Sequence, residues 1–277
     1  MKRPTVTFET KVYENDWQYL LVGNYLSKMI SNNGFSFDRR VLIINNVLNR
    51  AKVEKYAIKK VSQGVIDQYY FVDDYAADAL DFYGLNKSSF GTGYYYSISE
   101  IVGLYLCETD YLCHYSSDSI QYPSASNWIE ESIKLFETNK NILVANPLWS
   151  FKVKLNDSQV GSDKFHFADA GFSDQCYLIR KEDLNKNTFK HHHPDADVIY
   201  PLHGGELFEK KIYCYMKFYN KHRITFLRSY YRHQNFSKSI LVKKIHIISN
   251  GIFLHFRIPL FETKKWLISR LSRITRN

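Results

Sequence analysis

Strand patterns alternate with helix patterns through the first 150 residues, and this alternation constrains the fold more than any other feature of the sequence. Strands joined by helices make right-handed crossovers, which place the strands parallel to one another in one sheet. After about residue 150 the alternation fades into a mixed region of strands and helices. We therefore expect an α/β fold with a mostly parallel, Rossmann-type sheet flanked by helices. The predicted strands are 5–10, 39–47, 67–76, 110–117 and 141–149, and the predicted helices are 14–30, 49–64, 97–109 and 127–140.

The composition indicates a folded protein rather than a disordered one. Of the 277 residues, 45% are hydrophobic and 16% are aromatic, which is enough apolar surface for a large core. Residues 1–10 lack the apolar stretch of a signal peptide, and no run approaches the roughly 20 apolar residues of a membrane-spanning helix. The sequence thus favours a cytoplasmic protein. Its four cysteines form no CxxC pair and are expected to be buried and reduced: Cys107, Cys113, Cys176 and Cys214.

Positive charge is concentrated at the C-terminal end. Residues 221–277 contain 13 Lys or Arg and one acid, a charge of +12, so the first 220 residues sum to −3 of the chain's +9. Within this end, residues 260–274 place leucine and isoleucine on one helical face and basic residues off it. Such a helix suits the inner surface of an anionic plasma membrane, or alternatively packs on its own domain with a solvated basic face. Nucleic acid is a minor alternative partner, since no nucleic-acid-binding motif accompanies the basic residues.

Polar residues follow several of the predicted strands. Asn45, Asp73 and Asp118 each stand near the end of a strand. In open parallel sheets, ligands gather beyond the carboxyl ends of the strands, at the point where the strand order reverses. We therefore expect a ligand site at this edge of the sheet.

Residues 91–119 hold the most specific pattern in the chain: a glycine loop, a helix, a short charged turn, an apolar strand, and a small or acidic cluster at the strand's end. This order resembles the donor-binding half of GT-A glycosyltransferases of the family-2 type, in which such a strand ends in a D-x-D motif. Asp118 matches the second acidic position of that motif, and Ser116 stands at the first. The resemblance implies that Asp118 helps to hold Mg²⁺ or Mn²⁺ on the diphosphate of a nucleotide-sugar. Alternatively, Asp118 is a helix cap or turn residue.

A turn with two glycines leads into another predicted helix and puts Glu206 in its first turn. In inverting GT-A enzymes, a glycine-containing loop and an acidic motif at this place supply the general base. The resemblance therefore implies that Glu206 deprotonates the acceptor hydroxyl, with Glu209 as the alternative base. Leu207 stands where the second acid of the motif is expected. Both glutamates could instead pair with Lys210 and Lys211 on the helix surface.

The same resemblance implies two more site residues in the later part of the chain. His233 lies where many GT-A enzymes carry a histidine that completes the metal shell, with His222 as the alternative. Asp174 precedes a strand expected to lie under the acceptor, where its carboxylate would contact the acceptor hydroxyl. Alternatively, His233 is a structural residue packed among aromatic side chains, and Asp174 is a turn residue before the strand. The histidine run at 191–193 matches no zinc spacing and is interpreted as a polar loop beside the acceptor cleft.

Binding of the donor's base, ribose and phosphates is expected nearer the N-terminus. The resemblance places Thr10 and Tyr13 at the end of the first strand, where the Tyr13 ring can stack on a planar base. Asp73 is the candidate partner of a base imide or a ribose hydroxyl. Asn45 at the second strand end and Gly93 in the glycine loop complete the predicted donor contacts. Each of these residues is equally compatible with an ordinary loop.

Taken in chain order, the motifs between residues 5 and 236 predict a metal-dependent, inverting glycosyltransferase. Its expected substrates are a nucleotide-sugar donor and a glycan or lipid-linked acceptor, in the biosynthesis of a surface polysaccharide such as lipopolysaccharide or capsule. Residues 1–237 are expected to form a GT-A-like domain, with a nucleotide-sugar-binding half at 1–150 and an acceptor half at 151–237. Residues 238–277 are expected to form a basic amphipathic extension. The alternative is a catalytically impaired protein of the same fold that binds nucleotide-sugars or glycans.

Overall fold

The computed structural model describes residues 3–122, 127–149, 164–200 and 204–234, together with Phe236, Ser239 and Val242. The predicted amphipathic helix at 260–274 lies outside the described residues. Within the part of the chain that is described, no helix has the length and apolar character needed to cross a membrane.

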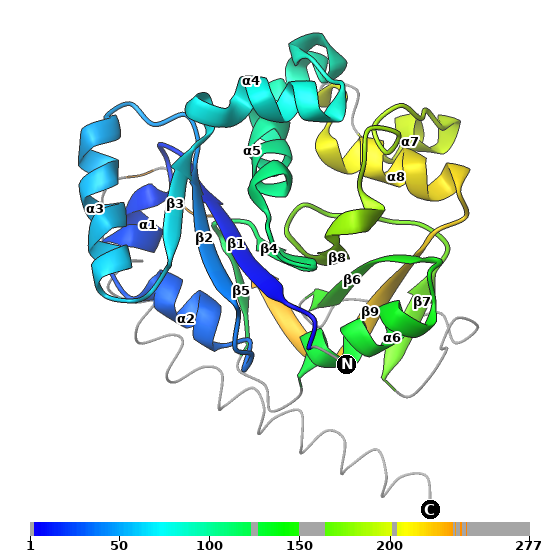
Figure 1. The fold of residues 1–277 in the computed structure, drawn as a ribbon, viewed down its shortest axis with the longest axis horizontal. Coiled ribbons are helices and arrows are strands. Elements are labelled where there is room, and N and C mark those ends of the chain that lie inside the picture. Colours follow the sequence, from blue (N-terminus) through cyan, green and yellow to red (C-terminus); the bar gives the residue numbers. More distant parts are fainter. Residues whose placement is uncertain are drawn as a thin grey trace, which may run out of the picture.

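One sheet organises the described residues (Figure 1). Its strands are β1 (Val6–Val12), β2 (Arg39–Ile44), β3 (Gln68–Phe71), β4 (Tyr111–Tyr115), β5 (Ser119–Gln121), β6 (Ile142–Trp149), β7 (Phe165–Ala168), β8 (Cys176–Arg180) and β9 (His222–His233). Their order is β3-β2-β1-β4-β8-β6-β9-β5, and β7 also pairs with β9. Strands β1, β2, β3, β4, β6 and β9 run in one direction, whereas β5, β7 and β8 run in the other. The predicted mostly parallel, Rossmann-type α/β sheet with a mixed later region is therefore confirmed.

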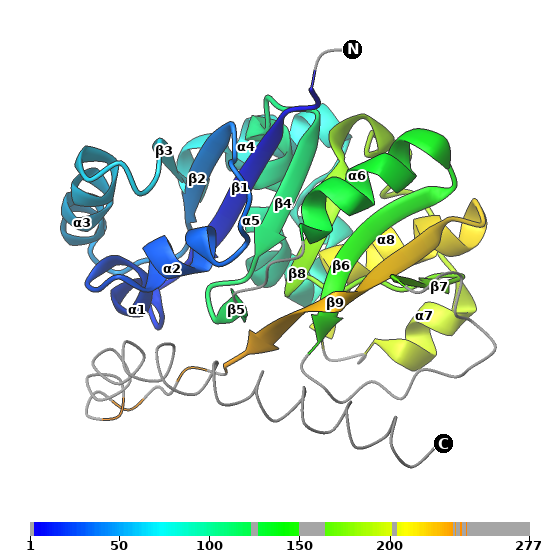
Figure 2. The same ribbon diagram turned by 90° about the horizontal axis from the view of Figure 1, so that it is seen from below.

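Helices cover both faces of the sheet (Figure 2). The α-helices are α1 (Trp17–Leu21), α2 (Tyr25–Ser31), α3 (Arg50–Ser62), α4 (Val72–Tyr83), α5 (Tyr94–Leu106), α6 (Trp128–Thr138), α7 (Pro194–Ile199) and α8 (Phe208–Phe218), with 3₁₀ turns at Lys87–Ser89, Gly91–Gly93 and Lys181–Asp183. Apolar residues of α1, α2, α3 and α6 pack on one face, and those of α4, α5 and α8 pack on the other. The sheet thus lies between two hydrophobic cores.

The structure corrects two of the predicted elements. The helix predicted at 14–30 is divided into α1 and α2, with Gly23 in the break between them. The strand predicted at 67–76 ends at Phe71, because α4 begins at the next residue and continues to a left-handed Gly84 (φ +64°). Asp73 consequently lies in the first turn of a helix. The four cysteines are buried and free, as predicted.

Alternation along β1 decides which of its side chains can reach the ligand edge. Val6 and Phe8 point into the core beneath α1, α2 and α3. Glu9 and Lys11 point to the opposite face, where they meet α5. One buried and one partly buried charged side chain, Glu9 and Lys11, thereby lie between the sheet and a helix.

Candidate functional site

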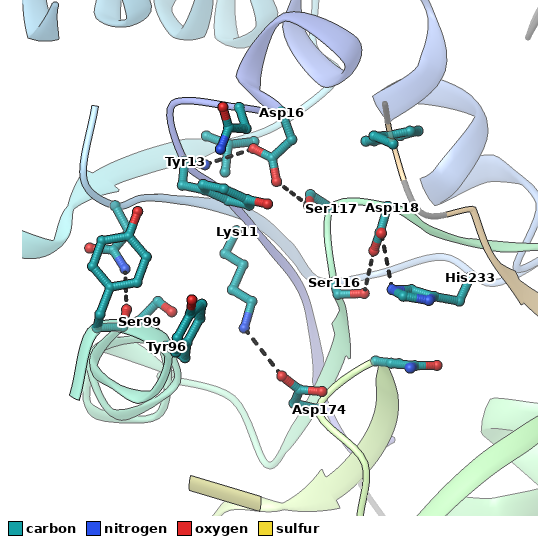
Figure 3. Close-up of a pocket in the computed structure, with 16 residues that line it drawn as sticks. Lys11, Tyr13, Asp16, Tyr96, Ser99, Ser116, Ser117, Asp118, Asp174 and His233 are labelled. Carbon is teal, nitrogen blue, oxygen red and sulfur yellow. Dashed lines mark hydrogen bonds and ion pairs between the residues drawn. The ribbon is translucent and has the colours of Figure 1, made fainter. Parts of the chain in front are cut away.

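A pocket of about 430 Å³ lies at the carboxyl ends of β1, β2 and β4 (Figure 3). The parallel strands reach this edge together, so the residues that follow them converge, as predicted. Sixteen described residues line the pocket: Lys11, Val12, Tyr13, Asn15, Asp16, Asn45, Tyr95, Tyr96, Ser99, Ser116, Ser117, Asp118, Asp174, Gln175, His233 and Phe236.

Asp118 and His233 form one wall of this pocket. Strand β5 pairs with β9 so that Ser119 faces His233, and this register places the preceding Asp118 beside the imidazole. His233 Nε2 lies 3.0 Å from Asp118 Oδ2, and Ser116 Oγ donates a hydrogen bond of 3.2 Å to Asp118 Oδ1. The hydrogen bond to Asp118 raises the pKa of His233, although burial acts against it. His233 therefore stays protonated to a higher pH than an isolated histidine would.

Asp16 lies beside this wall in the turn between β1 and α1. Its Oδ1 accepts a 2.7 Å hydrogen bond from the backbone N–H of Tyr13, and its Oδ2 accepts one from Ser117 Oγ. Burial raises the pKa of Asp16 to about 7, against these two hydrogen bonds, which lower it, and the Asp118 charge adds to the rise. Burial also raises the pKa of the Tyr13 hydroxyl to about 12. Near neutral pH, Asp16 is thus partly protonated and holds the Tyr13 loop against Ser117.

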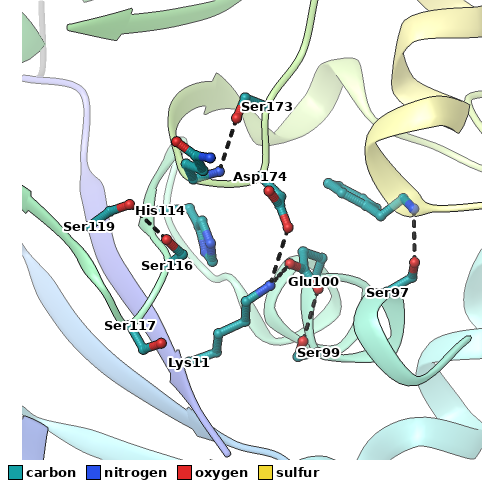
Figure 4. A network of polar contacts seen from close by, with 12 residues as sticks. Lys11, Ser97, Ser99, Glu100, His114, Ser116, Ser117, Ser119, Ser173 and Asp174 are labelled. Atoms are coloured by element: carbon teal, nitrogen blue, oxygen red, sulfur yellow. Dashed lines mark hydrogen bonds and ion pairs between the residues drawn. The ribbon is translucent and has the colours of Figure 1, made fainter. Parts of the chain in front are cut away.

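The floor of the pocket is built around Lys11 (Figure 4). Its Nζ bonds to Glu100 of α5 and lies 3.8 Å from Asp174 Oδ2. Burial acts to lower the pKa of Lys11, but Glu100 and Asp174 outweigh it and raise the pKa. Glu209 of α8 is half-buried beside them, and its carboxylate accepts a hydrogen bond from the Asp174 backbone. Burial, followed by the Asp174 charge, raises the pKa of Glu209 to about 8.

A second acidic group is buried beneath the floor. Glu9 Oε2 lies 2.6 Å from His114 Nδ1, and both side chains are almost completely excluded from solvent. The His114 ring stacks on Tyr177 with centroids 4.7 Å apart. A Cβ at Gly103 of α5 would lie 3.3 Å from the Glu9 carboxylate, so this glycine allows α5 to approach the strand closely. Glu9 and Glu100 thus form an acidic layer between β1 and α5, and both raise the pKa of Lys11.

The glycine turn at residues 91–93 contacts the glycine turn at residues 204–205. A Cβ at Gly93 would lie 2.7 Å from the carbonyl oxygen of Gly204, and one at Gly205 would lie 2.6 Å from Thr92 Oγ1. The adjoining Glu206 N–H donates a 3.0 Å hydrogen bond to Phe90 O. Both glycines thus permit close packing of the start of α5 against the segment before α8.

Some predicted site residues lie outside the pocket. The Thr10 side chain points to the other face of β1 and donates a hydrogen bond of 2.7 Å to Tyr115 O. Asp73 is exposed on α4. Glu206 precedes α8 rather than lying in its first turn, and its carboxylate is 2.6 Å from Lys210 Nζ. The pocket therefore brings together five of the predicted residues, Tyr13, Asn45, Asp118, Asp174 and His233, whereas Thr10, Asp73, Gly93 and Glu206 are not among its lining residues.

Sequence reasoning missed Lys11, Asp16, Glu100 and Ser117. The period-two pattern of β1 contained a signal for Lys11, because a lysine on the face opposite Phe8 must lie against a helix or at the open edge. No comparable signal marked Glu100, which lies within an otherwise apolar helix pattern. Glu100 pairs with Lys11 because α5 packs against β1, and a sequence pattern does not specify that packing.

Among the described residues, no group of three or more His, Cys, Asp or Glu is placed to hold a metal ion. Asp118 and His233, the two predicted metal ligands, lie 3.0 Å apart in the pocket. The histidine run does not add to them: His192 pairs with Asp197, and His193 caps α7.

No protein-family model matches the chain, and no curated protein sequence matches it. Among solved structures, it is similar to glucosyl-3-phosphoglycerate synthase from Mycobacterium tuberculosis, with 11% identity over 65% of this chain and 57% of that chain and a TM-score of 0.38. It is also similar to GalNAc-T7, with 10% identity over 89% of this chain and 48% of that chain and a TM-score of 0.49. A third similar structure is TarS from S. aureus, with 11% identity over 91% of this chain and 43% of that chain and a TM-score of 0.47. The chain spans about half the length of these three proteins. The assignment of the fold rests on the sheet topology described above.

Proposed function

We propose that this chain is a glycosyltransferase that moves a sugar from a nucleotide-sugar donor to a glycan or lipid-linked acceptor. One observation carries the proposal: a single pocket at the strand ends places the Asp118–His233 pair on one wall and the Asp174 carboxylate, held by Lys11, on the other (Figure 3). Glycosyl transfer needs a group that stabilises the negative charge developing on the leaving diphosphate, and it needs a base that deprotonates the attacking hydroxyl.

The donor would lie along the wall formed by Tyr13, Asn45 and Asp118. Tyr13 offers a ring for the nucleotide base. Asp118 and His233 would hold a divalent cation between them, and their chemistry suits it: a carboxylate and an imidazole, both partly exposed to the pocket. A bound Mn²⁺ or Mg²⁺ would neutralise the charge that develops on the diphosphate. His233 must lose its proton before it can bind a metal, so cation binding competes with the ion pair.

Asp174 is the general base in this proposal. It lies in the pocket with its side chain 40% exposed, so an acceptor hydroxyl can approach its carboxylate. Lys11 lies beside it, and Glu209 accepts a hydrogen bond from its backbone, so both residues position Asp174. Glu206, the base implied by the sequence resemblance, is bonded to Lys210 and lies outside the pocket lining. We therefore assign the proton transfer to Asp174 and keep Glu206 as the variant to compare with it.

The proposed setting is the assembly of a surface polysaccharide, with the basic C-terminal residues at an anionic membrane surface. The resemblance stated above and the charge of residues 221–277 support this setting.

A second candidate function is binding of a nucleotide-sugar or glycan without transfer. Two features favour it: Ser116 replaces the first acid of the D-x-D motif, and Asp118 is already paired with His233.

Incubation of the full chain with UDP-, GDP- and CMP-sugars, with and without Mn²⁺, separates the two candidates. The transferase proposal predicts release of free nucleotide from one donor class by slow hydrolysis, dependent on Mn²⁺. It also predicts that Asp174→Asn abolishes transfer to an added acceptor. Nucleotide-sugar binding without any turnover, across the whole panel and with acceptor glycans present, would leave only the binding protein.

A further inference from the structure

A second cavity, of about 340 Å³, lies on the other side of the segment that carries Asp174. Gln175 lines both this cavity and the main pocket, while the neighbouring Ser173 lines only the second cavity and Asp174 only the first. Strands β6, β7 and β9 supply most of the remaining wall. A molecule with one group at Asp174 could therefore extend past Gln175 into this cavity.

Among the described residues that line this cavity, Arg223 of β9 is the charged one and none is an acid. Among the described residues it forms no ion pair, and its Nε is buried with no hydrogen-bond partner. A Cβ at Gly171 would lie 3.0 Å from Arg223 Nη1. The Gly171 backbone, in a left-handed conformation at φ +146°, thus packs directly against the guanidinium and limits its movement. Desolvation lowers the pKa of Arg223, as expected for a partly buried cation with no acidic partner among the described residues.

Polar side chains surround this guanidinium on the same face of the sheet. Arg223 and Thr225 are two residues apart on β9, and the register pairs Thr225 with His166 on β7 and with Asn146 on β6. Thr225 Oγ1 donates a 3.3 Å hydrogen bond to Asn146 Oδ1. Trp149, 46% exposed, lies at the end of β6 and presents an indole to the cavity. A cation, neutral hydrogen-bonding groups and one aromatic surface are the elements of a site for a charged sugar.

We propose that this cavity is an acceptor subsite that binds an anionic group, a carboxylate or a phosphate, on the sugar unit that receives the transferred residue. The inference rests on the proposed function, because Asp174 defines where the reacting hydroxyl lies. The planar guanidinium of Arg223 presents two N–H groups in parallel, the geometry that a carboxylate or phosphate accepts. Acceptors that lack a negative charge leave the Arg223 guanidinium without an acidic partner among the described residues, so the subsite selects for acidic glycans.

Calorimetry on the full chain tests this subsite with three monosaccharide probes: glucose as the neutral reference, glucuronic acid for a carboxylate, and glucose 6-phosphate for a phosphate. We expect at least one anionic probe to bind about tenfold or more tightly than glucose, and the two anionic arms distinguish carboxylate from phosphate. Arg223→Gln should remove this advantage. Arg223→Lys keeps the charge but loses the paired donors, and should retain only part of it; it also serves if Arg223→Gln does not fold.

Binding of UDP with Mn²⁺ is the internal control, because it depends on the other wall of the main pocket and should be the same in both Arg223 variants. If glucose binds as tightly as both anionic probes, or if neither Arg223 variant weakens the anionic probes, the subsite is wrong. If the anionic probes bind through Arg223 while no nucleotide binds the wild-type chain, the proposed transfer fails and the anion site itself still holds.

Discussion

The two walls of the main pocket each hold a carboxylate beside a cation, but they differ in what the cation can do. On one wall Asp118 lies 3.0 Å from His233, and both side chains are about one fifth exposed. On the other wall Asp174 lies 3.8 Å from Lys11, whose Nζ also bonds to the buried Glu100. Histidine can release its proton within the physiological range, whereas a lysine with a raised pKa cannot. The first pair can therefore open when the imidazole loses its proton, as metal binding in the proposed function requires, whereas the second stays an ion pair.

Under the proposed function, this difference would assign the two halves of the reaction to opposite walls. An exchangeable pair suits the donor side, where a cation must come and go with the nucleotide. A fixed lysine suits the acceptor side, where a carboxylate must stay ionised to accept a proton. Variants on each wall should accordingly affect different measurements.

The largest expected effect is on the acceptor wall. Asp174→Asn removes the carboxylate that accepts the hydroxyl proton, and transfer activity should fall by about 100-fold or more, with UDP binding unchanged. Glu206→Gln is the matched variant, because Glu206 lies outside the pocket lining and should retain activity within about threefold. The opposite result, full activity in Asp174→Asn and loss in Glu206→Gln, would return the base role to Glu206.

Removal of the permanent cation should destabilise the fold. Lys11→Met leaves Glu100 buried without its partner, and the free energy of unfolding should fall by about 3 kcal/mol or more. The double variant Lys11→Met with Glu100→Gln removes both charges and should recover much of the loss. Urea denaturation measures all three proteins. Equal stability of the single and double variants would show that the pair does not act as a unit.

The donor wall should respond through metal-dependent binding rather than stability. Asp118→Asn and His233→Ala should each weaken Mn²⁺-dependent binding of UDP by about 10-fold or more. Mutation of a residue that only hydrogen-bonds to a metal ligand already lowers metal affinity by about 10- to 100-fold. Binding should also weaken as the pH falls through the raised pKa of His233. Asp73→Asn, on the exposed first turn of α4, is the control. Calorimetry that finds wild-type affinity in the Asp118 variant would exclude it as a metal ligand.

Asp16 affects the pH dependence of stability rather than activity or binding. Its folded-state pKa of about 7 lies above the usual 3.8, so the folded chain holds a proton that the unfolded chain releases. Stability conferred by this proton is fully present below about pH 4 and is lost as the pH rises towards 7. Asp16→Asn should remove this dependence, changing the slope of stability against pH by about 1 kcal/mol per pH unit between pH 4.5 and 6.5. Identical slopes in the two proteins would contradict the raised pKa.

Strand and helix periodicity predicted most of the first half of the fold. The patterns of β1, β2, β4, α3, α5 and α6 were strong enough that the predicted segments overlap the observed elements. The sequence does not predict α4, because the helix follows β3 without a turn residue between them. The residues "VDDYA" therefore look like a continuation of the strand. Loop chemistry predicts helix boundaries poorly when one element begins where another ends.

The site was predictable where a residue's place in the chain order decides its place in space. Asp118 and His233 are 115 positions apart, and the pairing of β5 with β9 brings their side chains together. Contacts that depend on how a helix packs on the sheet were not predictable. Glu100 and Glu209 reach the pocket floor from α5 and α8, and their spacing in the sequence gives no information about Lys11.

We propose that the pocket at the strand ends binds a nucleotide through a metal ion held on the Asp118 wall. Calorimetric titration of the full chain with UDP, GDP and CMP, in Mn²⁺ and again after chelation, tests it most directly. We predict that one nucleotide binds in Mn²⁺, that chelation abolishes this binding, and that Asp118→Asn does the same. Absence of binding by all three nucleotides in Mn²⁺, or binding that chelation does not change, would contradict the claim.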